Sequence, residues 1–286
     1  KPMAAQVDRD NLFPAELWAE MGELGLLGIT VSEEYGGSGM GYLAHTIAVE
    51  EIARVSPSIS LSYGAHSNLC VNQLKLNGTD EQKRRFLPGI VDVTELWSQG
   101  YSEPGAGSDL GSLITTATPN GDGTYALNGQ KIYITWGDHD ATDNIVHLVL
   151  ARLPDAPKGP KGISLFLASK FEVTPDGTLG ERNSFRPVGI EHKLGIHASP
   201  TCVMAYENAT GWLVGEEGRG MNNMFVVMNE ARLGTGLQGL AIGTAAYQAA
   251  VREGALAEQL GSSYAIERLT SVKGFRILAI ERLDDG

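Results

Sequence analysis

Cysteine and basic residues are scarce in this chain, and each scarcity excludes a class of protein. The two cysteines, Cys70 and Cys202, lie far apart and match no metal-ligand spacing. We expect two buried thiols in a reducing compartment rather than a disulfide framework. The 22 Lys and Arg residues stand against 34 Asp and Glu, which gives a net charge of −12. Without a basic stripe to displace counterions from phosphates, the chain is not expected to bind nucleic acid.

Long apolar runs are also lacking. The longest run, residues 233–250, is interrupted by glycine and polar residues, namely Gly234, Thr235, Gly236, Gln238 and Gly239. This pattern predicts a closely packed bundle helix and no membrane span. The first residues are polar and do not resemble a secretory signal peptide. With 42% hydrophobic and 20% charged residues, the composition is that of a soluble globular protein.

The patterning divides the chain into three blocks, and 286 residues suffice for two or three domains. Residues 1–95 carry helical apolar spacing and a capping signature, TDEQ, that begins at Thr79. Residues 96–212 have the pattern of short strands separated by turns, and residues 213–286 are helical again. Since no long helix separates the strands, we expect an α+β fold. It comprises an N-terminal helical domain, a middle antiparallel β-barrel or sandwich domain, and a partial C-terminal helical bundle.

The same patterns predict the individual elements. A strong hairpin turn, NGDG, begins at Asn120 and separates two of the predicted strands. Strands are expected over residues 112–118, 124–135, 145–152 and 162–168, with a weaker one over 203–207. Helices are expected over residues 41–55, 58–76, 217–258 and 264–283.

The turn YSEPGAGSD, residues 101–109, has more special residues than an ordinary surface loop requires. Pro104 fixes one φ angle, and the two glycines of the turn allow close approach of another molecule. Its serines and aspartate leave hydrogen-bonding groups at the rim. The turn is either a connection between two domains or one wall of a binding site. The second motif, NGQKIYIT over residues 128–135, follows one predicted hairpin later and favours the binding site.

Three familiar chemistries do not fit these residues. The glycine spacing after Pro104 is not that of a Rossmann fingerprint, and no βαβ unit follows. Ser102 and Ser108 lack the Gly-x-Ser-x-Gly context of a hydrolase nucleophile. Residues 138–140, Asp-His-Asp, lack a nameable third ligand, so a hydrogen-bonded turn is expected there and no metal site. Any nucleotide must therefore be held by strands and loops.

Three separated motifs in this α–β–α order resemble the acyl-CoA dehydrogenase family: YSEPGAGSD, NGQKIYIT, and KLGIHASPTC from Lys193. The resemblance runs from about residue 12 to residue 250. The stretch ISLSYGAHSNLCVNQ from Ile59 is similar to the isovaleryl-CoA branch of the family. By contrast, DNIVHLVLARLPDAP from Asp143 and NATGWL from Asn208 are similar to the methylthiopropionyl-CoA branch. The two similarities leave the acyl substrate open.

The resemblance implies FAD-dependent α,β-dehydrogenation of a short or modified acyl-CoA thioester. In that reaction a carboxylate removes the α proton, fixed donors stabilise the enolate oxygen, and hydride leaves the β carbon for the flavin. Ser108, Asn229 and Arg232 are the implied substrate contacts. The implied cofactor contacts are Gln99, Tyr101, Ser102, Gly107, Ser108, Tyr133, Ile134 and Thr135.

The catalytic base is the open point of the resemblance. Most of the family carry it on a late helix that would lie beyond Gly286, and the isovaleryl type has it at the position of Ala231. Glu230 lies one residue earlier, about 100° around the helix. It is the candidate base only if a bulge re-aims it, and the other interpretation is a solvated or paired glutamate. The chain therefore resembles a truncated member with an incomplete C-terminal domain.

The resemblance also implies partners. An electron-transfer flavoprotein would accept the electrons, and the protein would be a homo-oligomer, either a tetramer or a dimer, in the bacterial cytoplasm or the mitochondrial matrix. Two other functions stay open. A flavin oxidase or monooxygenase could use the same platform, and the missing base would suit a catalytically silent protein that binds flavin or acyl-CoA.

Overall fold

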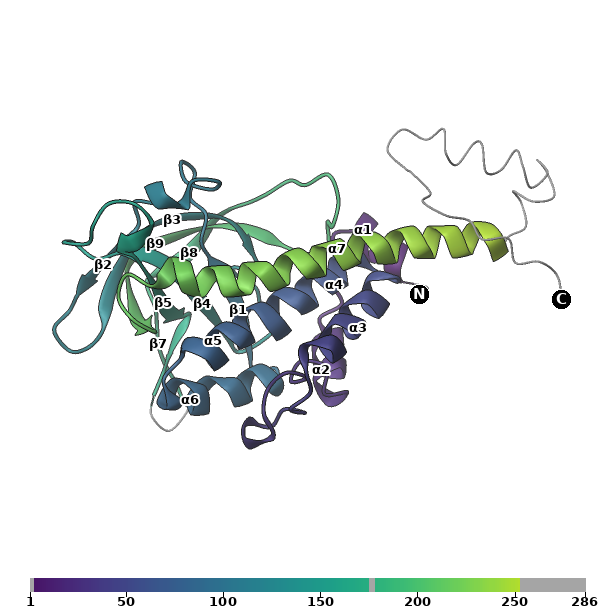
Figure 1. Ribbon diagram of the computed structural model, residues 1–286, viewed down its shortest axis with the longest axis horizontal. Helices are drawn as coiled ribbons and strands as arrows, with labels where there is room; N and C mark the ends of the chain where they lie inside the picture. Colours follow the sequence, from purple (N-terminus) through teal and green to yellow (C-terminus); the bar gives the residue numbers. More distant parts are fainter. Residues whose placement is uncertain (1–2, 175–177, 253–286) are drawn as a thin grey trace.

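The computed structural model describes residues 3–174 and 178–252. A helical layer and a strand layer lie side by side, and the long helix α7 (Gly220–Arg252) runs along both of them (Figure 1). The helix expected over residues 217–258 is thus present as α7 within the described residues. The helix expected over residues 264–283 lies outside them.

The helical layer forms from the first third of the chain. Ser56 accepts a hydrogen bond from the Ile59 N–H and Pro57 occupies the first helical position, so a helix starts there as capping rules predict. At the Thr79 signature, the Thr79 hydroxyl and the Gln82 side chain form a reciprocal capping box. The helices are α1 (Ala4–Arg9), α2 (Glu16–Glu23), α3 (Tyr42–Ala53), α4 (Pro57–Gly64), α5 (Val71–Asn77) and α6 (Asp80–Val91).

The expected helix over residues 58–76 contains a feature that the sequence did not indicate. Between α4 and α5 the chain forms a π-helix, η2 (Ala65–Cys70). Inside η2, His66 accepts a hydrogen bond from the Trp97 N–H at 3.1 Å, and its other ring nitrogen lies 3.2 Å from the Ile90 carbonyl oxygen. These bonds tie the π-helix to the first strand of the sheet, through Trp97, and to α6, through Ile90.

The strand layer is a seven-stranded sheet with the path β1-β4-β2-β3-β9-β5, to which β8 adds by pairing with β9. Most neighbours are antiparallel, as expected, and the exceptions are the parallel pairings of β4 with β1 and with β2. A separate pair, β6 with β7, forms a second small sheet. The strands are β1 (Glu95–Gly100), β2 (Thr116–Pro119), β3 (Tyr125–Thr135), β4 (Asn144–Arg152), β5 (Ile163–Ser169), β6 (Phe171–Val173), β7 (Leu179–Arg182), β8 (Phe185–Ile190) and β9 (Thr201–Val214).

Two strand predictions need correction. The strand expected to be weak over residues 203–207 is the long β9, which pairs with β3, β5 and β8. Its length was hidden because Asn208, at φ 57°, and Gly211 interrupt the alternating pattern. The strand expected from residue 112 begins only at Thr116, because residues 110–112 form the short 3₁₀ helix η3 (Leu110–Ser112).

One apolar cluster joins the two layers. Leu74 of α5 and Ile90 of α6 are buried together with Trp97 of β1 and Leu148 of β4, and Met224 of α7 packs into the same cluster. Burial of each such side chain is worth about 1.5–3 kcal/mol. The helices are thereby held at a fixed position against β1, at the edge where the motif residues 101–109 begin.

Two expectations about the cysteines and the membrane can be compared with the structure. Cys70 and Cys202 are both free and buried, as expected. No helix within residues 3–174 and 178–252 is both long and apolar enough to cross a membrane.

Candidate functional site

Two adjoining cavities lie in the region of α4 and η2, one against the strand layer and one among the helices. The first, called here the strand cavity, has a volume of about 170 Å³ and opens between β1, β3 and the helix α4 with η2. It brings together residues from both sequence motifs, namely Gln99, Tyr101, Ser102, Tyr133 and Thr135. These positions are far apart in sequence, and the hairpin of β2 and β3 returns the second motif to the first. The structure thus places five predicted cofactor contacts around one space.

Gln99 and Ser102 supply polar groups to the strand cavity. The Gln99 Nε2 atom is buried and has no hydrogen-bond partner among the described residues, apart from the Cys70 thiol that the side chain approaches. Buried amide donors are normally satisfied, so this one is available to an acceptor in the cavity. Ser102 is held in place by its carbonyl oxygen, which accepts the Ile132 N–H at 2.9 Å.

Tyr133 reaches the rim of the strand cavity because β3 is bulged. The register of β3 against β9 shifts between Lys131 and Ile134, and Tyr133 takes a positive φ of 60°. Such a conformation is strained for an aromatic residue and is found mostly at functional sites. The bulge leaves the Tyr133 side chain 64% exposed. It turns Ile134 into the core instead, so Ile134 does not line the cavity with its side chain.

The outer part of the turn stays open. Gly107 and Ser108 are exposed, and a Cβ built on Gly107 would meet nothing within 4 Å. Neither residue lines the strand cavity, so contacts of these two positions with a cofactor or substrate remain predictions.

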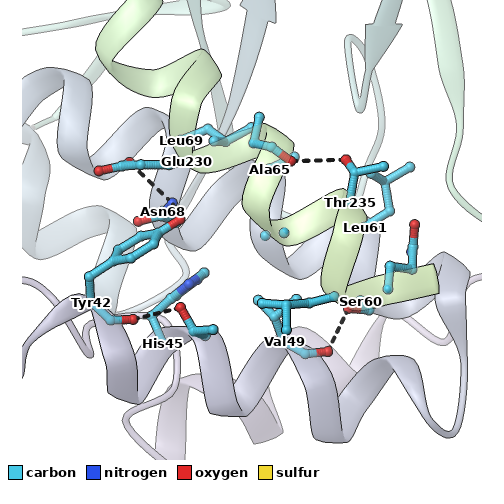
Figure 2. Close-up of a pocket in the computed structure, with 16 residues that line it drawn as sticks. Tyr42, His45, Val49, Ser60, Leu61, Ala65, Asn68, Leu69, Glu230 and Thr235 are labelled. Carbon is cyan, nitrogen blue, oxygen red and sulfur yellow. Dashed lines mark hydrogen bonds between the residues drawn. The ribbon is translucent and has the colours of Figure 1, made fainter. Parts of the chain in front are cut away.

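The second cavity, called here the helix cavity, has a volume of about 80 Å³ and lies between α3, α4, η2 and α7 (Figure 2). Its polar wall is formed by Glu230 of α7. The Glu230 carboxylate accepts hydrogen bonds from Asn72 Nδ2 at 2.8 Å and from Asn68 Nδ2 at 3.3 Å. Asn229 and Arg232 do not line this cavity. They are exposed and bond to each other, with Arg232 donating to Asn229 Oδ1 at 3.0 Å.

Two titratable groups of α3 face the same cavity. Burial and the negative charge of Glu230 raise the pKa of Tyr42 to about 12, and Asn68 donates to the Tyr42 hydroxyl at 3.1 Å. Burial lowers the pKa of His45 to about 4, so this ring is neutral at pH 7. Sequence reasoning missed Tyr42, His45, Asn68 and Asn72. The i,i+4 spacing of the two asparagines on one predicted helix face was the available signal.

The two cavities share a wall. Leu61 of α4 and Ala65 and Leu69 of η2 line both of them. A group in the strand cavity and a group in the helix cavity would therefore lie on either side of these three side chains. The His66 bonds to Trp97 of β1 and Ile90 of α6 fix this shared wall in place.

Comparison with known proteins identifies this architecture. The model of the acyl-CoA dehydrogenase N-terminal domain matches residues 1–94, and the model of the acyl-CoA dehydrogenase middle domain matches residues 98–209. The chain belongs to the acyl-CoA dehydrogenase family. The helical layer and the strand layer thus correspond to the first two domains of the family, and α7 to the start of a third.

Two curated relatives agree with both branches of the sequence resemblance. A 3-methylmercaptopropionyl-CoA dehydrogenase of Ruegeria pomeroyi is 42% identical over 87% of this chain and 40% of the relative. A mitochondrial isovaleryl-CoA dehydrogenase of Solanum tuberosum is 43% identical over 77% of this chain and 51% of the relative. This acyl-CoA dehydrogenase chain spans about half the length of these relatives or less.

A solved structure shows the same fold. An acyl-CoA dehydrogenase from Bacillus anthracis, complexed with FAD, is 31% identical with a TM-score of 0.68, and the match covers 79% of this chain and 36% of that one. The strand cavity is suited to such a group by its own chemistry. It offers the side-chain amide of Gln99, hydroxyls at Ser102 and Thr135, and an exposed aromatic ring at Tyr133.

Proposed function

We propose that this chain is the cofactor-binding and acyl-binding part of an acyl-CoA dehydrogenase, which forms a double bond between the α and β carbons of a short or modified acyl-CoA thioester. The shared wall of Leu61, Ala65 and Leu69 carries this proposal. A redox cofactor in the strand cavity and an acyl chain in the helix cavity would meet there, as the transfer of hydrogen between them requires.

FAD bound in the strand cavity would supply the acceptor for the hydrogen of the β carbon. Gln99, Ser102 and Thr135 would hold its polar edge, and Tyr133 would cover a face of its ring. The strained backbone of Tyr133 supports this role, because strain of this kind is retained where the direction of a side chain matters.

The helix cavity would hold the acyl chain. Two of its hydroxyls already donate to backbone carbonyls: Ser60 donates to Val49, and Thr235 donates to Ala231 (Figure 2). The remaining surface is mainly apolar side chains such as Leu61 and Leu69. A volume of about 80 Å³ suits a short acyl group.

Glu230 is the candidate base within the described residues. It is the one acidic side chain that lines either cavity there. Asn72 and Asn68 donate to its carboxylate at 2.8 Å and 3.3 Å, which holds the carboxylate in place at the wall of the helix cavity. Glu230→Gln keeps the shape and removes this function. If Glu230 is the base, the rate of flavin reduction by acyl-CoA falls by 10²-fold or more.

A catalytically silent binding protein is the second candidate function. One observation favours it: Glu230 lines the helix cavity but not the strand cavity, and two amides already occupy its carboxylate. In that case the chain would bind FAD and acyl-CoA without transferring hydrogen.

The partners and compartment are part of the proposal. Reduced flavin would pass its electrons to an electron-transfer flavoprotein, and the protein would act as a homo-oligomer in the bacterial cytoplasm or the mitochondrial matrix. Support comes from family membership and from the paired relatives, one bacterial and one mitochondrial.

One experiment tests both candidates. The purified protein is loaded with FAD, and its visible spectrum is recorded without oxygen before and after addition of isovaleryl-CoA or 3-methylmercaptopropionyl-CoA. Loss of the flavin absorbance supports the dehydrogenase, and a yellow protein that no acyl-CoA bleaches supports the silent binder. Rapid reoxidation in air would indicate an oxidase or monooxygenase. A protein that takes up no FAD contradicts the proposal.

A further inference from the structure

A fully buried lysine lies between the two motifs that form the strand cavity. Lys131, in the middle of β3, is 0% exposed, and its partner Glu103 in the turn is 4% exposed. Lys131 Nζ lies 2.8 Å from Glu103 Oε1 and donates to the Tyr101 carbonyl oxygen at 3.1 Å. Removing two such charges from water costs several kcal/mol for each ion. A pair that only filled space could be replaced by apolar side chains at no loss.

The Glu103 carboxylate also binds the backbone around it. Its carboxylate accepts the Ile114 N–H at 2.7 Å and the Thr115 N–H at 3.0 Å, as well as the Thr115 hydroxyl. Burial favours a raised pKa for Glu103, but the Lys131 charge and these donors hold its pKa below the usual value. Apolar replacements would leave the two N–H groups and the Tyr101 carbonyl without partners.

The pair lies at the junction of the two cavity walls. Glu103 follows Ser102 in the turn, and Lys131 precedes the bulge that aims Tyr133. Glu103 also forms a β-bridge with Ala106, which closes the turn on itself. Neither charged side chain lines the strand cavity. The ion pair therefore sets the distance between the wall that carries Tyr101 and Ser102 and the wall that carries Tyr133.

We propose that Lys131 and Glu103 are positioning residues, whose ion pair fixes the two walls of the strand cavity at the separation that the flavin requires. This inference rests on the proposed binding of FAD. A merely structural ion pair would lower stability when broken but leave the FAD affinity and the flavin environment of the folded protein unchanged.

The test uses Lys131→Met, which keeps the length of the stem and removes the charge. FAD affinity is measured by titration, and the flavin environment by visible circular dichroism, both on protein shown to be folded by far-ultraviolet circular dichroism. We expect a dissociation constant at least tenfold higher and an altered visible spectrum. Lys131→Arg keeps the charge with a different reach, and we expect it to fold and to recover part of the affinity.

A matched control is available in another ion pair. Lys170 Nζ lies 2.6 Å from Asp138 Oδ1, and neither residue lines the strand cavity. We expect Lys170→Met to change the dissociation constant of FAD less than twofold.

Three outcomes would overturn the inference. One is a folded Lys131→Met protein with the FAD affinity and visible spectrum of the parent protein. If Lys131→Met does not fold, a folded Glu103→Gln protein, which neutralises the pair from the other side, overturns it as well when its affinity and spectrum are those of the parent protein. The third is a parent protein that does not bind FAD, which defeats the proposed function and this inference together. The first two outcomes leave the proposed function intact.

Discussion

Two glutamates of this protein, the buried Glu103 in the strand layer and the partly buried Glu230 in the helical layer, show how differently the fold uses a carboxylate. Glu103 is paired with a buried lysine and accepts two backbone N–H groups and a hydroxyl. Glu230 has only two neutral amide donors, and it faces a cavity. The Glu103 carboxylate is fully used in contacts that hold the fold, whereas the Glu230 carboxylate keeps acceptor sites for a ligand. Predictions on either side can test this contrast.

The largest effect is expected from breaking the Glu103 pair. Glu103→Ala would leave Lys131 buried without a counter-charge and would strip partners from the Ile114 and Thr115 N–H groups. We expect the free energy of unfolding to fall by about 3–5 kcal/mol. Urea denaturation followed by circular dichroism measures it. A loss below about 1 kcal/mol would mean that the ion pair contributes little to stability, and it would contradict the structural role assigned to Glu103.

The next effect is an acid sensitivity at the buried histidines, which lie in both layers: His45 and His66 in the helical layer, and His147 in β4, where burial likewise lowers the pKa to about 4. Burial lowers the pKa values of His45 and His66 to about 4, below the unfolded value of 6.5. Between these values the unfolded state binds more protons, so stability falls as the pH drops from about 6.5 towards 4. The loss between pH 7 and pH 5 is about 2 kcal/mol per histidine.

Glu103 should resist the same change, because its pKa is held below the usual carboxyl value and its stabilising charge persists to lower pH. Hydrogen exchange at pH 7 and pH 5 compares the histidine-bearing elements with the turn around Glu103. Amides of α3, η2 and β4, which carry His45, His66 and His147, should lose protection, while the Ile114 and Thr115 amides bound by Glu103 keep it. Equal losses at both places would contradict the prediction.

A smaller effect is expected at Tyr133, where binding and stability should separate. Tyr133→Gly removes the ring from the strand cavity and also relieves the positive φ of 60°. We expect the dissociation constant of FAD to rise about tenfold, equivalent to about 1.4 kcal/mol, with no loss in the free energy of unfolding. Tyr133→Phe is the control and should keep the parent affinity. Unchanged FAD binding in Tyr133→Gly would remove Tyr133 from the cofactor site.

The smallest effect is expected from Glu230→Gln on stability. The neutral amide retains one acceptor oxygen for Asn72, and no buried cation is left unpaired. We expect the free energy of unfolding to change by less than about 1 kcal/mol, as for a hydrogen bond weakened but not lost. Thermal unfolding at pH 7 beside Glu103→Gln gives the direct comparison. A larger loss at Glu230 than at Glu103 would reverse the assignment of structural and functional roles.

Much of this architecture could be predicted from local patterns. The capping box at Thr79 and the hairpin turn from Asn120 have short-range signals, and both form as expected. The family resemblance selected Gln99, Tyr101, Ser102, Tyr133 and Thr135, which the structure gathers around one cavity.

The rest depends on contacts between residues that are far apart in sequence. The parallel pairing of β1 with β4 cannot be read from either strand alone. The bonds from Asn68 and Asn72 to Glu230 span more than half of the chain. Tyr133 faces the cavity and Ile134 enters the core because β3 has a bulge. The alternating pattern of a strand does not predict such a bulge.

The π-helix Ala65–Cys70 is a place where deletion of a single residue would change the shared wall of the two cavities. A π turn accommodates one residue more than an α turn, so deleting one residue would restore regular α-helical register. The part of the helix before the deletion would then rotate by about 100° relative to the part after it. Leu61 would leave the shared wall, while Asn72 would keep its bond to Glu230. Relatives that differ by one residue here would present a different acyl surface on an unchanged sheet.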